Sequence, residues 1–425
     1  MRTVLQGGVV VRPDGVFAAD ISFENGQILE MGERLPADGA EAVDATGCYV
    51  LPGAVDVLVH CLPEHLEATG NAAAQGGTTC HGWPAPADGA GPDVPAQLPV
   101  DVVRLAPLPE GEVGGASLHW LDARRLEAAG AAAVALCEAA RADASVLLRP
   151  DLPGLGRFLE AELRAAGRTA VSNWTAAAPE YVEEEAARLA VALARAAACR
   201  LALLPLSCGG SLEAVRLARQ WRQSVWAATS PQYLLLDETA YEEGAAEGLK
   251  YAMRPPLRAA GQASRLWEAL AGGLLDAVTS DHHDTTFAAK WEAGAADAFA
   301  CPAGIPGVET RVPLLFSEGV LKGRLTLPRF VQCLCSNPAQ LLGLGQRKGD
   351  LRPGFDADIC LLDPAEERLL TARRLHQGDY TPFEGLSVRG WPRAVWLRGE
   401  RLPVDGREGG PAHTLHGMWL TGGAD

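Results

Sequence analysis

Residues 51–65 read LPGAVDVLVHCLPEH, and the prediction of the fold starts from this stretch. An apolar run leads to Asp56 and His60, whose side chains can carry protons or bind a metal, with Leu58 between them. Side chains alternate between the two faces of a β-strand, so Asp56, Leu58 and His60 are expected to share one face. An acid and an imidazole near a strand end indicate a metal or proton-transfer site, yet a leucine can serve neither purpose.

From Leu51 onward, apolar strand-like runs alternate with alanine-rich helical stretches such as 124–142 and 179–198. Strands are predicted at eight places, namely AVDVLVH (54–60), TTCHGW (78–83), VVRLAPL (102–108), SVLLRP (145–150), TAVSNW (169–174), RLALLPLS (200–207), SVWAATS (224–230) and DAVTSD (276–281). Apolar strands joined by helices are typical of a parallel sheet, and about eight such units predict a TIM-type (β/α)8 barrel.

Both chain ends differ from the middle of the chain in their pattern of apolar and polar residues. TVLQGGVVV (3–11) and AADISFENGQILEMG (18–32) alternate apolar and polar residues between Asn-Gly and Gly turns, as short strands do. KGDLRPGFDADICLLDP (348–364) and GWPRAVWLRGERL (390–402) resemble them. The predicted fold is therefore α/β, with a barrel over residues 52–344, a small β-sandwich domain formed by 1–51 plus 345–404, and a C-terminal tail at 405–425.

Composition narrows the class of protein. A net charge of −16 opposes binding to phosphate backbones and anionic lipid, so no nucleic-acid partner is expected. The chain has no run of eighteen apolar residues and no apolar leader at its start, so no membrane partner is expected and the predicted location is the cytoplasm. Ten cysteines without any C-x-x-C pair indicate reduced core thiols.

Ten motifs, taken in order, carry a family resemblance. They include LPGAVDVLVH (51–60), AAAQGGTTC (72–80), MRPPLR (253–258), GLLDAVTSDH (273–282), SNPAQLLGL (336–344) and TPFEGLSVRGWPRAVWLRGE (381–400). Together they resemble the cyclic amidohydrolases, most of all the dihydropyrimidinases and hydantoinases, which are related to dihydroorotase and allantoinase. The resemblance runs from about residue 3 to residue 402. It implies a TIM-type barrel with a β-sandwich made by both termini, in agreement with the pattern of strands and helices.

The resemblance also implies a binuclear metal centre that this sequence does not supply. Active members hold two ions with a His-x-His pair, a carboxylated Lys, two further His and an Asp, and the metal-bound hydroxide attacks a ring amide. In this chain the pair falls on Leu58 and His60, and the Asp falls on Asp281. The Lys position falls near Leu147, and the two further His positions fall on Ser172 and Pro205.

Two functions are the main alternatives at this stage, and a ligand-sensing protein that binds ring compounds without turnover is a third. The favoured one is a non-catalytic structural or regulatory subunit with a degenerate binuclear site and no expected cofactor. The alternative is a hydrolase of cyclic amide bonds that uses one zinc ion at a rebuilt site, with His60 and Asp281 joined by His81 or Cys80 and by His283. Scattered rim histidines that bind no metal are the simpler interpretation of these residues. In the enzyme interpretation, Asp281 keeps the family's catalytic role.

The resemblance suggests two substrate-binding positions and a class of partner. Asn337 matches a position that contacts the substrate ring through its backbone, and Arg254 stands where hydantoinases place a serine, which would favour an acidic ligand. Inactive relatives assemble with themselves or with an enzyme such as a transcarbamoylase or a related amidohydrolase. A homo-oligomer, dimer or tetramer, is therefore expected.

Overall fold

A barrel of parallel strands forms the centre of the structure, a computed structural model that describes residues 1–85, 98–109, 113, 117–404 and 417–420. In ladder order its strands are β8 (Ala54–Asp56), β10 (Thr78–Pro84), β11 (Asp101–Pro107), β12 (Leu118–Leu121), β13 (Ser145–Leu148), β14 (Arg200–Leu203), β15 (Val225–Thr229) and β16 (Ala277–Val278). Two short continuations, β9 (Val59–His60) and β17 (His282–His283), pair with each other and close the barrel. The predicted (β/α)8 barrel is confirmed.

A buried carboxylate joins the first strand to the last. The Thr279 hydroxyl donates to Asp56 Oδ1 at 2.6 Å, and the Ser280 amide donates to the same oxygen at 3.0 Å. The guanidinium of Arg311 lies opposite, 3.4 Å from Asp56 Oδ2, and both side chains are fully buried. Arg311 also donates to the Val278 carbonyl, so one ion pair ties both ends of the barrel seam.

The barrel interior is filled with aliphatic side chains. One cluster takes a residue from each of the eight strands, namely Val55, Cys80, Val103, Leu118, Leu147, Ala202, Ala228 and Ala277. Val57 and Leu58 both belong to it, because the first strand is interrupted between β8 and β9. Asp56 therefore does not share a face with Leu58 and His60, and that expectation is wrong. A packed interior of this kind is usual for the fold, whose chemistry lies at the carboxyl ends of the strands.

One predicted strand is absent and another was missed. Residues 169–174 were expected to form a strand, but the chain forms the 3-10 turn Val171–Asn173 there. The indole of Trp174 is buried, and its Nε1 donates to the Met253 carbonyl at 2.8 Å. The strand that was missed is β12, which is the fourth strand of the barrel and has only four residues. SVLL (145–148), expected to be the fourth strand, is the fifth.

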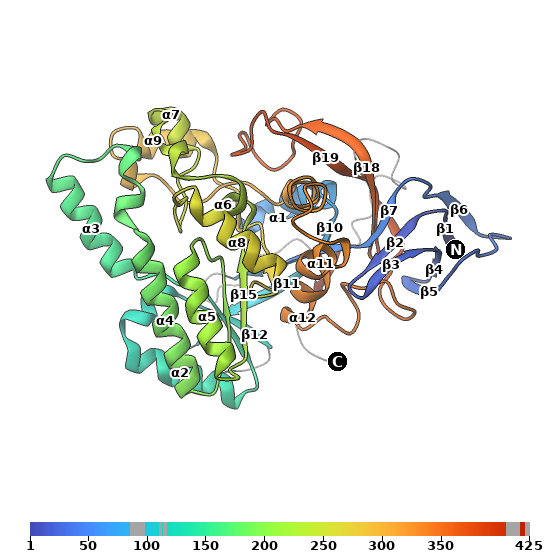
Figure 1. The fold of residues 1–425 in the computed structure, drawn as a ribbon, viewed down its shortest axis with the longest axis horizontal. Coiled ribbons are helices and arrows are strands. Elements are labelled where there is room, and N and C mark those ends of the chain that lie inside the picture. The colour runs from blue at the N-terminus through green and yellow to red at the C-terminus, as the bar shows by residue number, and fades with distance from the viewer. Residues whose placement is uncertain (86–97, 110–112, 114–116, 405–416, 421–425) are drawn as a thin grey trace.

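Helices surround the barrel, and α2 to α5 cover its outer side at the left of Figure 1. The longer helices are α1 (Leu66–Gln75), α2 (Ala129–Arg141), α3 (Pro153–Ala165), α4 (Glu180–Ala196), α5 (Gly209–Gln220), α8 (Gly261–Ala271) and α9 (Phe287–Gly294). Shorter ones are α6 (Pro231–Leu235), α7 (Ala245–Leu249), α10 (Arg311–Leu315), α11 (Leu327–Val331) and α12 (Asn337–Leu341). The helix expected from Pro179 is α4, and Pro179 is its N-cap.

Two sheets from the chain ends lie beside the barrel, at the right of Figure 1. One has the order β5 (Gln27–Gly32), β4 (Asp20–Glu24), β1 (Thr3–Gln6), β6 (Glu41–Asp44). The other has the order β20 (Glu400–Leu402), β19 (Ser387–Leu397), β18 (Ile359–Leu369), β7 (Tyr49–Pro52), β2 (Val9–Arg12), β3 (Gly15–Ala18). Within the expected tail, residues 405–416 and 421–425 lie outside the described residues, while β21 (Trp419–Leu420) pairs with β11.

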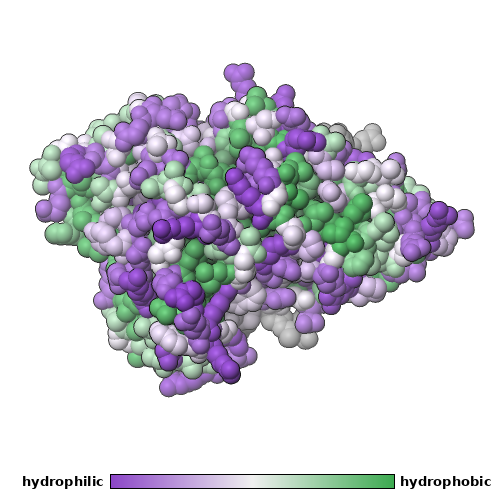
Figure 2. Space-filling view, viewed as in Figure 1, coloured by the Kyte–Doolittle hydropathy of each residue, from purple (hydrophilic) through white to green (hydrophobic). Residues whose placement is uncertain are grey.

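On the face drawn in Figure 2, polar residues are interspersed with several apolar patches, one of them near the junction of barrel and sheets. On the face drawn in Figure 2, hydrophobic residues gather where β2 and β3 meet α11. Val16 of β3 is 44% exposed there. Among the described residues, no helix combines the length and apolar character needed to cross a bilayer.

A buried cluster of charges joins the barrel to the second sheet. Lys348 Nζ lies 2.7 Å from Asp101 on β11, and 3.0 and 2.6 Å from Asp356 and Asp358, which precede β18. Burial alone lowers the pKa of Lys348, but the carboxylates of Asp358 and Asp101 raise it above its ordinary value. Arg398, the residue after β19, also pairs with Asp101. Arg347 pairs with Asp356 at 2.9 Å, so the three acids share three cations. The lysine ammonium takes the place that a metal ion would need.

Replacing Lys348 by methionine tests this cluster. Breaking a buried ion pair by removing one partner costs roughly 3–5 kcal/mol, because the remaining charges stay buried without a partner. We expect Lys348→Met to lose stability of that order in urea unfolding. Lys322→Met, at an exposed lysine paired with Glu318, should change stability by less than about 0.5 kcal/mol. Equal effects of the two substitutions would contradict the role assigned to Lys348.

Candidate functional site

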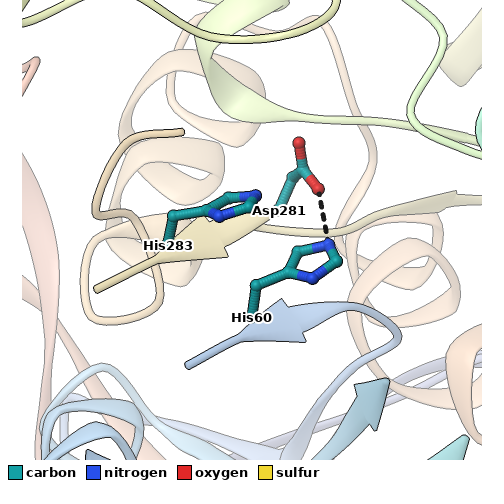
Figure 3. Close-up of side chains that lie close together, drawn as sticks. All are labelled: His60, Asp281 and His283. Atoms are coloured by element: carbon teal, nitrogen blue, oxygen red, sulfur yellow. Dashed lines mark ion pairs between the residues drawn. The ribbon is translucent and has the colours of Figure 1, made fainter. Parts of the chain in front are cut away.

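Three side chains from the first and last strands converge at the barrel mouth. The pairing of β9 with β17 places His283 opposite His60, and their rings stack at 4.3 Å between centroids with a 19° interplanar angle. His60 Nε2 lies 3.5 Å from Asp281 Oδ1 (Figure 3). One ligand atom from each residue lies within 4.8 Å of the others. The structure thus brings together three of the side chains proposed from the sequence as metal ligands.

A fourth residue, Arg149, enters this group from the opposite side of the barrel and was not predicted. It follows β13 directly, and its Nη2 donates to Asp281 Oδ1 at 2.9 Å. The same nitrogen lies 3.4 Å from His60 Nε2. The Asp281 side chain is 5% exposed, whereas those of Arg149 and His60 are 26% and 29% exposed. The only sequence signal for Arg149 was a cationic residue at the end of an apolar strand.

The loop behind His283 fixes its ring. The His283 amide donates to the Ile305 carbonyl at 2.9 Å, and the Gly304 amide donates to the Ala252 carbonyl at 3.0 Å. A Cβ at Gly304 would lie 2.3 Å from His283 Cγ, so only glycine leaves room for the imidazole. Burial, followed by the nearby His60 and the Arg149 charge, holds the pKa of His283 well below its usual range. The ring is therefore a neutral base at neutral pH.

A binuclear metal centre does not fit this mouth. β13 is the fifth strand of the barrel and not the fourth, so the expected alignment shifts by one strand. The Lys position expected near Leu147 belongs on β12. The His position expected at Ser172 belongs at the end of β13, where Arg149 lies. Leu58 is buried in the apolar interior cluster, and Pro205 is buried as well. Among the residues that the structure describes, the cluster at the mouth offers three metal donors and one guanidinium. That donor set can fit one ion, provided that Arg149 moves away.

Histidines on the neighbouring strands do not join the group. His81 lies between Cys80 and Gly82 on β10, and Cys80 points into the barrel interior, so His81 faces outward. Burial lowers the pKa of His81 to about 4. His119 on β12 is also buried, with its Nδ1 3.4 Å from the Pro107 carbonyl. Neither His81 nor Cys80 belongs to the three-residue cluster found among the described residues.

The two expected substrate contacts lie elsewhere. Arg254 Nη2 donates to Glu160 on α3 at 2.6 Å, and its guanidinium lies 4.9 Å from the centre of the Trp174 ring. Its charge is therefore matched within the protein. Asn337 Nδ2 donates to the Asp276 carbonyl at 2.8 Å. Asp276 precedes β16, so Asn337 lies at the amino end of the last strand, opposite the mouth.

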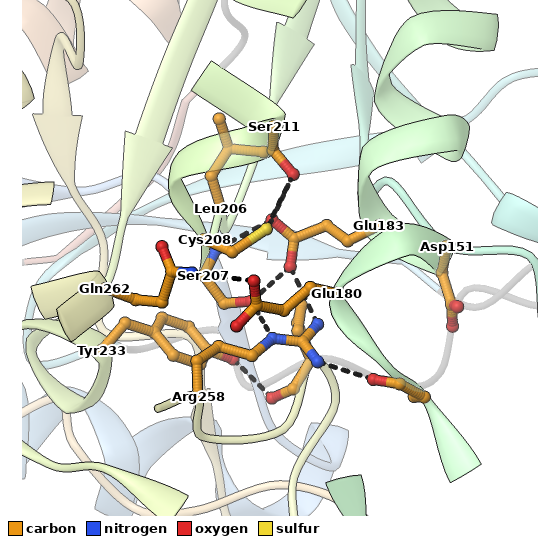
Figure 4. Close-up of polar contacts among 12 residues, drawn as sticks. Asp151, Glu180, Glu183, Leu206, Ser207, Cys208, Ser211, Tyr233, Arg258 and Gln262 are labelled. Carbon is orange, nitrogen blue, oxygen red and sulfur yellow. Dashed lines mark hydrogen bonds and ion pairs between the residues drawn. The ribbon is translucent and has the colours of Figure 1, made fainter. Parts of the chain in front are cut away.

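A second buried polar network links the loop after β14 to helices α4 and α5 (Figure 4). The Glu183 carboxylate on α4 accepts from the Ser207 amide at 2.9 Å and the Ser211 hydroxyl at 2.7 Å. Arg258 Nη2 lies 3.2 Å from the same carboxylate, and Arg258 also donates to the Ala178 carbonyl. Both charged side chains are almost fully buried. This ion pair joins α4, the start of α5 and the segment after Pro255.

Ser207 and Cys208, which follow a strand and precede a helix, do not form a nucleophilic site. The Ser207 hydroxyl is bonded to Glu183 and accepts from Arg258 Nε at 2.8 Å, so it is held in the network. The Cys208 thiol is buried, and burial together with the Glu183 charge raises its pKa far above that of an exposed thiol. A thiol is nucleophilic as thiolate, so Cys208 is inert. All ten cysteines are unbridged, and all except Cys61 and Cys137 are buried.

Comparison with known proteins identifies the family. The sequence model of the amidohydrolase family matches residues 207–402. The chain is 34% identical over 448 residues to a D-phenylhydantoinase of Escherichia coli, with 97% of this chain and 96% of the relative covered. The chain belongs to the cyclic amidohydrolases. The predicted family resemblance is thereby confirmed.

Solved amidohydrolase structures agree closely with the fold. Dihydropyrimidinase from Brevibacillus agri superimposes with a TM-score of 0.91 at 28% identity, covering 100% of this chain and 99% of that one. A D-hydantoinase superimposes with a TM-score of 0.89 at 30% identity, covering 99% of each chain. Hydantoinase from a Thermus species gives 0.90 at 28% identity, covering 99% of this chain and 98% of that one. The amidohydrolase scaffold is thus nearly complete, although its mouth carries an unusual set of side chains.

A buried lysine braces the loop behind His283. Lys290 on α9 is fully buried, and its Nζ donates to the carbonyls of Ala252 and Pro302 at 2.6 and 3.1 Å. Burial lowers its pKa to about 8. Because an unfolded lysine titrates near 10.4, the unfolded chain binds more protons than the folded chain between about pH 8 and 10.4. The contribution of Lys290 to the free energy of unfolding therefore becomes more favourable as the pH rises from about 8 to 10.4.

We expect wild type to gain roughly 3 kcal/mol relative to Lys290→Met as the pH is raised from 7.5 to 10.5, because the cost of burying the ammonium disappears. The measurement is urea unfolding of both proteins at half-unit pH intervals. Using the difference removes the titration of groups that the two proteins share. Parallel stability curves for the two proteins would show that Lys290 does not titrate in this range.

Proposed function

We propose that this cyclic amidohydrolase is a non-catalytic structural or regulatory subunit that keeps the hydantoinase scaffold without a working binuclear centre. The observation that supports this most directly is the Arg149–Asp281 ion pair at the barrel mouth. Of the expected binuclear donors, only His60 and Asp281 are present, and Asp281 is engaged by a guanidinium. Catalytic divalent ions in proteins usually have three or more protein ligands.

The remaining features of the mouth agree with this proposal. Leu58 packs into the apolar interior, and Pro205 has no side-chain donor. The Glu183–Arg258 and Asp56–Arg311 pairs keep the scaffold rigid without depending on a metal ion. The conserved outer shape would serve self-association or binding to a partner enzyme. The apolar area near β2, β3 and α11 offers a surface for such contacts.

Metal analysis and turnover test this function together. Untagged protein is expected to carry less than about a tenth of an equivalent of zinc, manganese, cobalt or nickel by mass spectrometry. The ion pair with Arg149 engages Asp281 and leaves only the two histidines of the cluster, which are too few ligands to hold a divalent ion tightly. Hydantoin and dihydrouracil should not be hydrolysed with or without added zinc or manganese. A metal-dependent rate that follows the folded protein through purification would refute the non-catalytic proposal.

A second candidate function rests on the His60–Asp281–His283 cluster. Two imidazoles and one carboxylate resemble the ligand set of catalytic zinc sites, which keep an open position. A divalent ion bound there would supply Lewis-acid polarisation of an amide carbonyl. In that case the protein would hydrolyse cyclic amide bonds, with Asp281 and the two histidines holding the ion.

A substitution of His283 distinguishes the two functions, because His283 belongs to the three-residue cluster and not to the expected binuclear ligand set. If the protein is a mononuclear hydrolase, it should contain close to one equivalent of zinc, and His283→Ala should lower both zinc content and turnover at least about tenfold. His65→Ala provides the control, since His65 is half exposed and pairs with Asp284 outside the cluster. Zinc content that is unchanged in His283→Ala would exclude this site.

A further inference from the structure

The guanidinium of Arg149 lies where a metal ion at the mouth would meet its ligands. Arg149 Nη2, His60 Nε2 and Asp281 Oδ1 form a triangle with sides of 2.9, 3.4 and 3.5 Å. Zinc bonds to nitrogen and oxygen ligands are about 2.0–2.2 Å long. An ion bound to both His60 and Asp281 would therefore either clash with the guanidinium or lie close to its positive charge. The arginine is therefore in direct competition with a cation for the same carboxylate oxygen.

Several contacts keep Arg149 in this position. It extends from the end of β13, on the side of the barrel across from β9 and β17. Asp281 is nearly buried and pairs with the arginine, and its backbone has a positive φ of 50°, which is uncommon for a residue other than glycine. A charged hydrogen bond to a desolvated carboxylate is among the stronger polar interactions.

We propose that Arg149 is a built-in cation that excludes divalent metal from a latent three-ligand site formed by His60, Asp281 and His283. This inference rests on the proposed function, in which the wild-type mouth holds no metal. Arg149 neutralises Asp281 and fills the space beside His60, so both the electrostatic attraction and the room for an ion are removed. His283 lies against His60 and completes the ligand set once the guanidinium is absent.

Titration with Zn²⁺ and Co²⁺ alone tests the inference. Arg149→Ala and the similarly long but neutral Arg149→Met should bind one equivalent of either ion at least about 100-fold more tightly than wild type, by calorimetry. Arg149→Lys keeps the positive charge and should bind as weakly as wild type. The visible absorption of bound Co²⁺ should appear in Arg149→Ala and disappear in the double variant Arg149→Ala/His283→Ala.

Matched controls address folding and specificity. Arg254→Ala removes another partly buried arginine with a carboxylate partner and should leave metal affinity at the wild-type value. Removing Arg149 leaves Asp281 without its cation, so zinc should raise the thermal midpoint of Arg149→Ala but not that of wild type. The midpoint assay reports binding even if Arg149→Ala is less stable in the absence of metal.

The outcomes separate this inference from the proposed function. If Arg149→Ala and Arg149→Met bind metal no better than wild type, the exclusion by Arg149 is refuted while the metal-free function stands. If wild type already binds one equivalent tightly, both the exclusion and the non-catalytic function fail. If the variants bind tightly but the double variant does as well, His283 is not a ligand and the latent site is wrong.

Discussion

The closure of the barrel at Asp56 determines what can happen at its mouth. Asp56 accepts hydrogen bonds from Thr279 and Ser280, which directly follow β16, and Arg311 balances its charge from outside the barrel. This fixes the register in which β9 and β17 pair, and the register places His60 beside His283 and Asp281. The site is thus a consequence of a buried ion pair that takes no part in its chemistry. A shift of one residue in this register would turn the two histidines away from each other.

The charge of the Asp281 carboxylate at the mouth can be balanced in two ways on the same scaffold. A hydantoinase-type centre needs several neutral or anionic donors around bound cations, whereas here a side chain supplies the cation. Asp281 is compensated in either case, so the carboxylate remains tolerable in a nearly buried position. Arg149 follows the end of β13, so this cation reaches the mouth from a position outside the packed barrel core. Buried networks such as Glu183–Arg258 have no comparable freedom, because each charge in them depends on a partner from another element.

Most of the fold could be predicted from the sequence, because apolar runs and alanine-rich helices mark the barrel units without reference to tertiary contacts. The failures have local causes. Residues 169–174 have a strand-like pattern, but the buried Trp174 indole bonded to Met253 favours a turn. β12 has four residues, too few for a periodic signal. The interruption between β8 and β9 placed Asp56 outside the site, and strand periodicity alone cannot reveal a break.

The candidate site was predicted in part, for a reason that lies in its long-range contacts. His60, Asp281 and His283 could be named because metal-ligating residue types near strand ends are visible in the sequence. Arg149 could not, since its meaning depends on a partner 132 residues away across the barrel. An arginine after an apolar strand is ordinarily a solvated end residue, and only the closed barrel turns it toward Asp281. Leu58 and Pro205 supply no metal donor at two positions where the family resemblance implies histidines, whereas the ion pair with Arg149 balances the charge of the Asp281 carboxylate within the protein. A mouth that only lacks metal ligands would leave the Asp281 carboxylate uncompensated. The contact between Arg149 and Asp281 shows that a side-chain cation compensates it here.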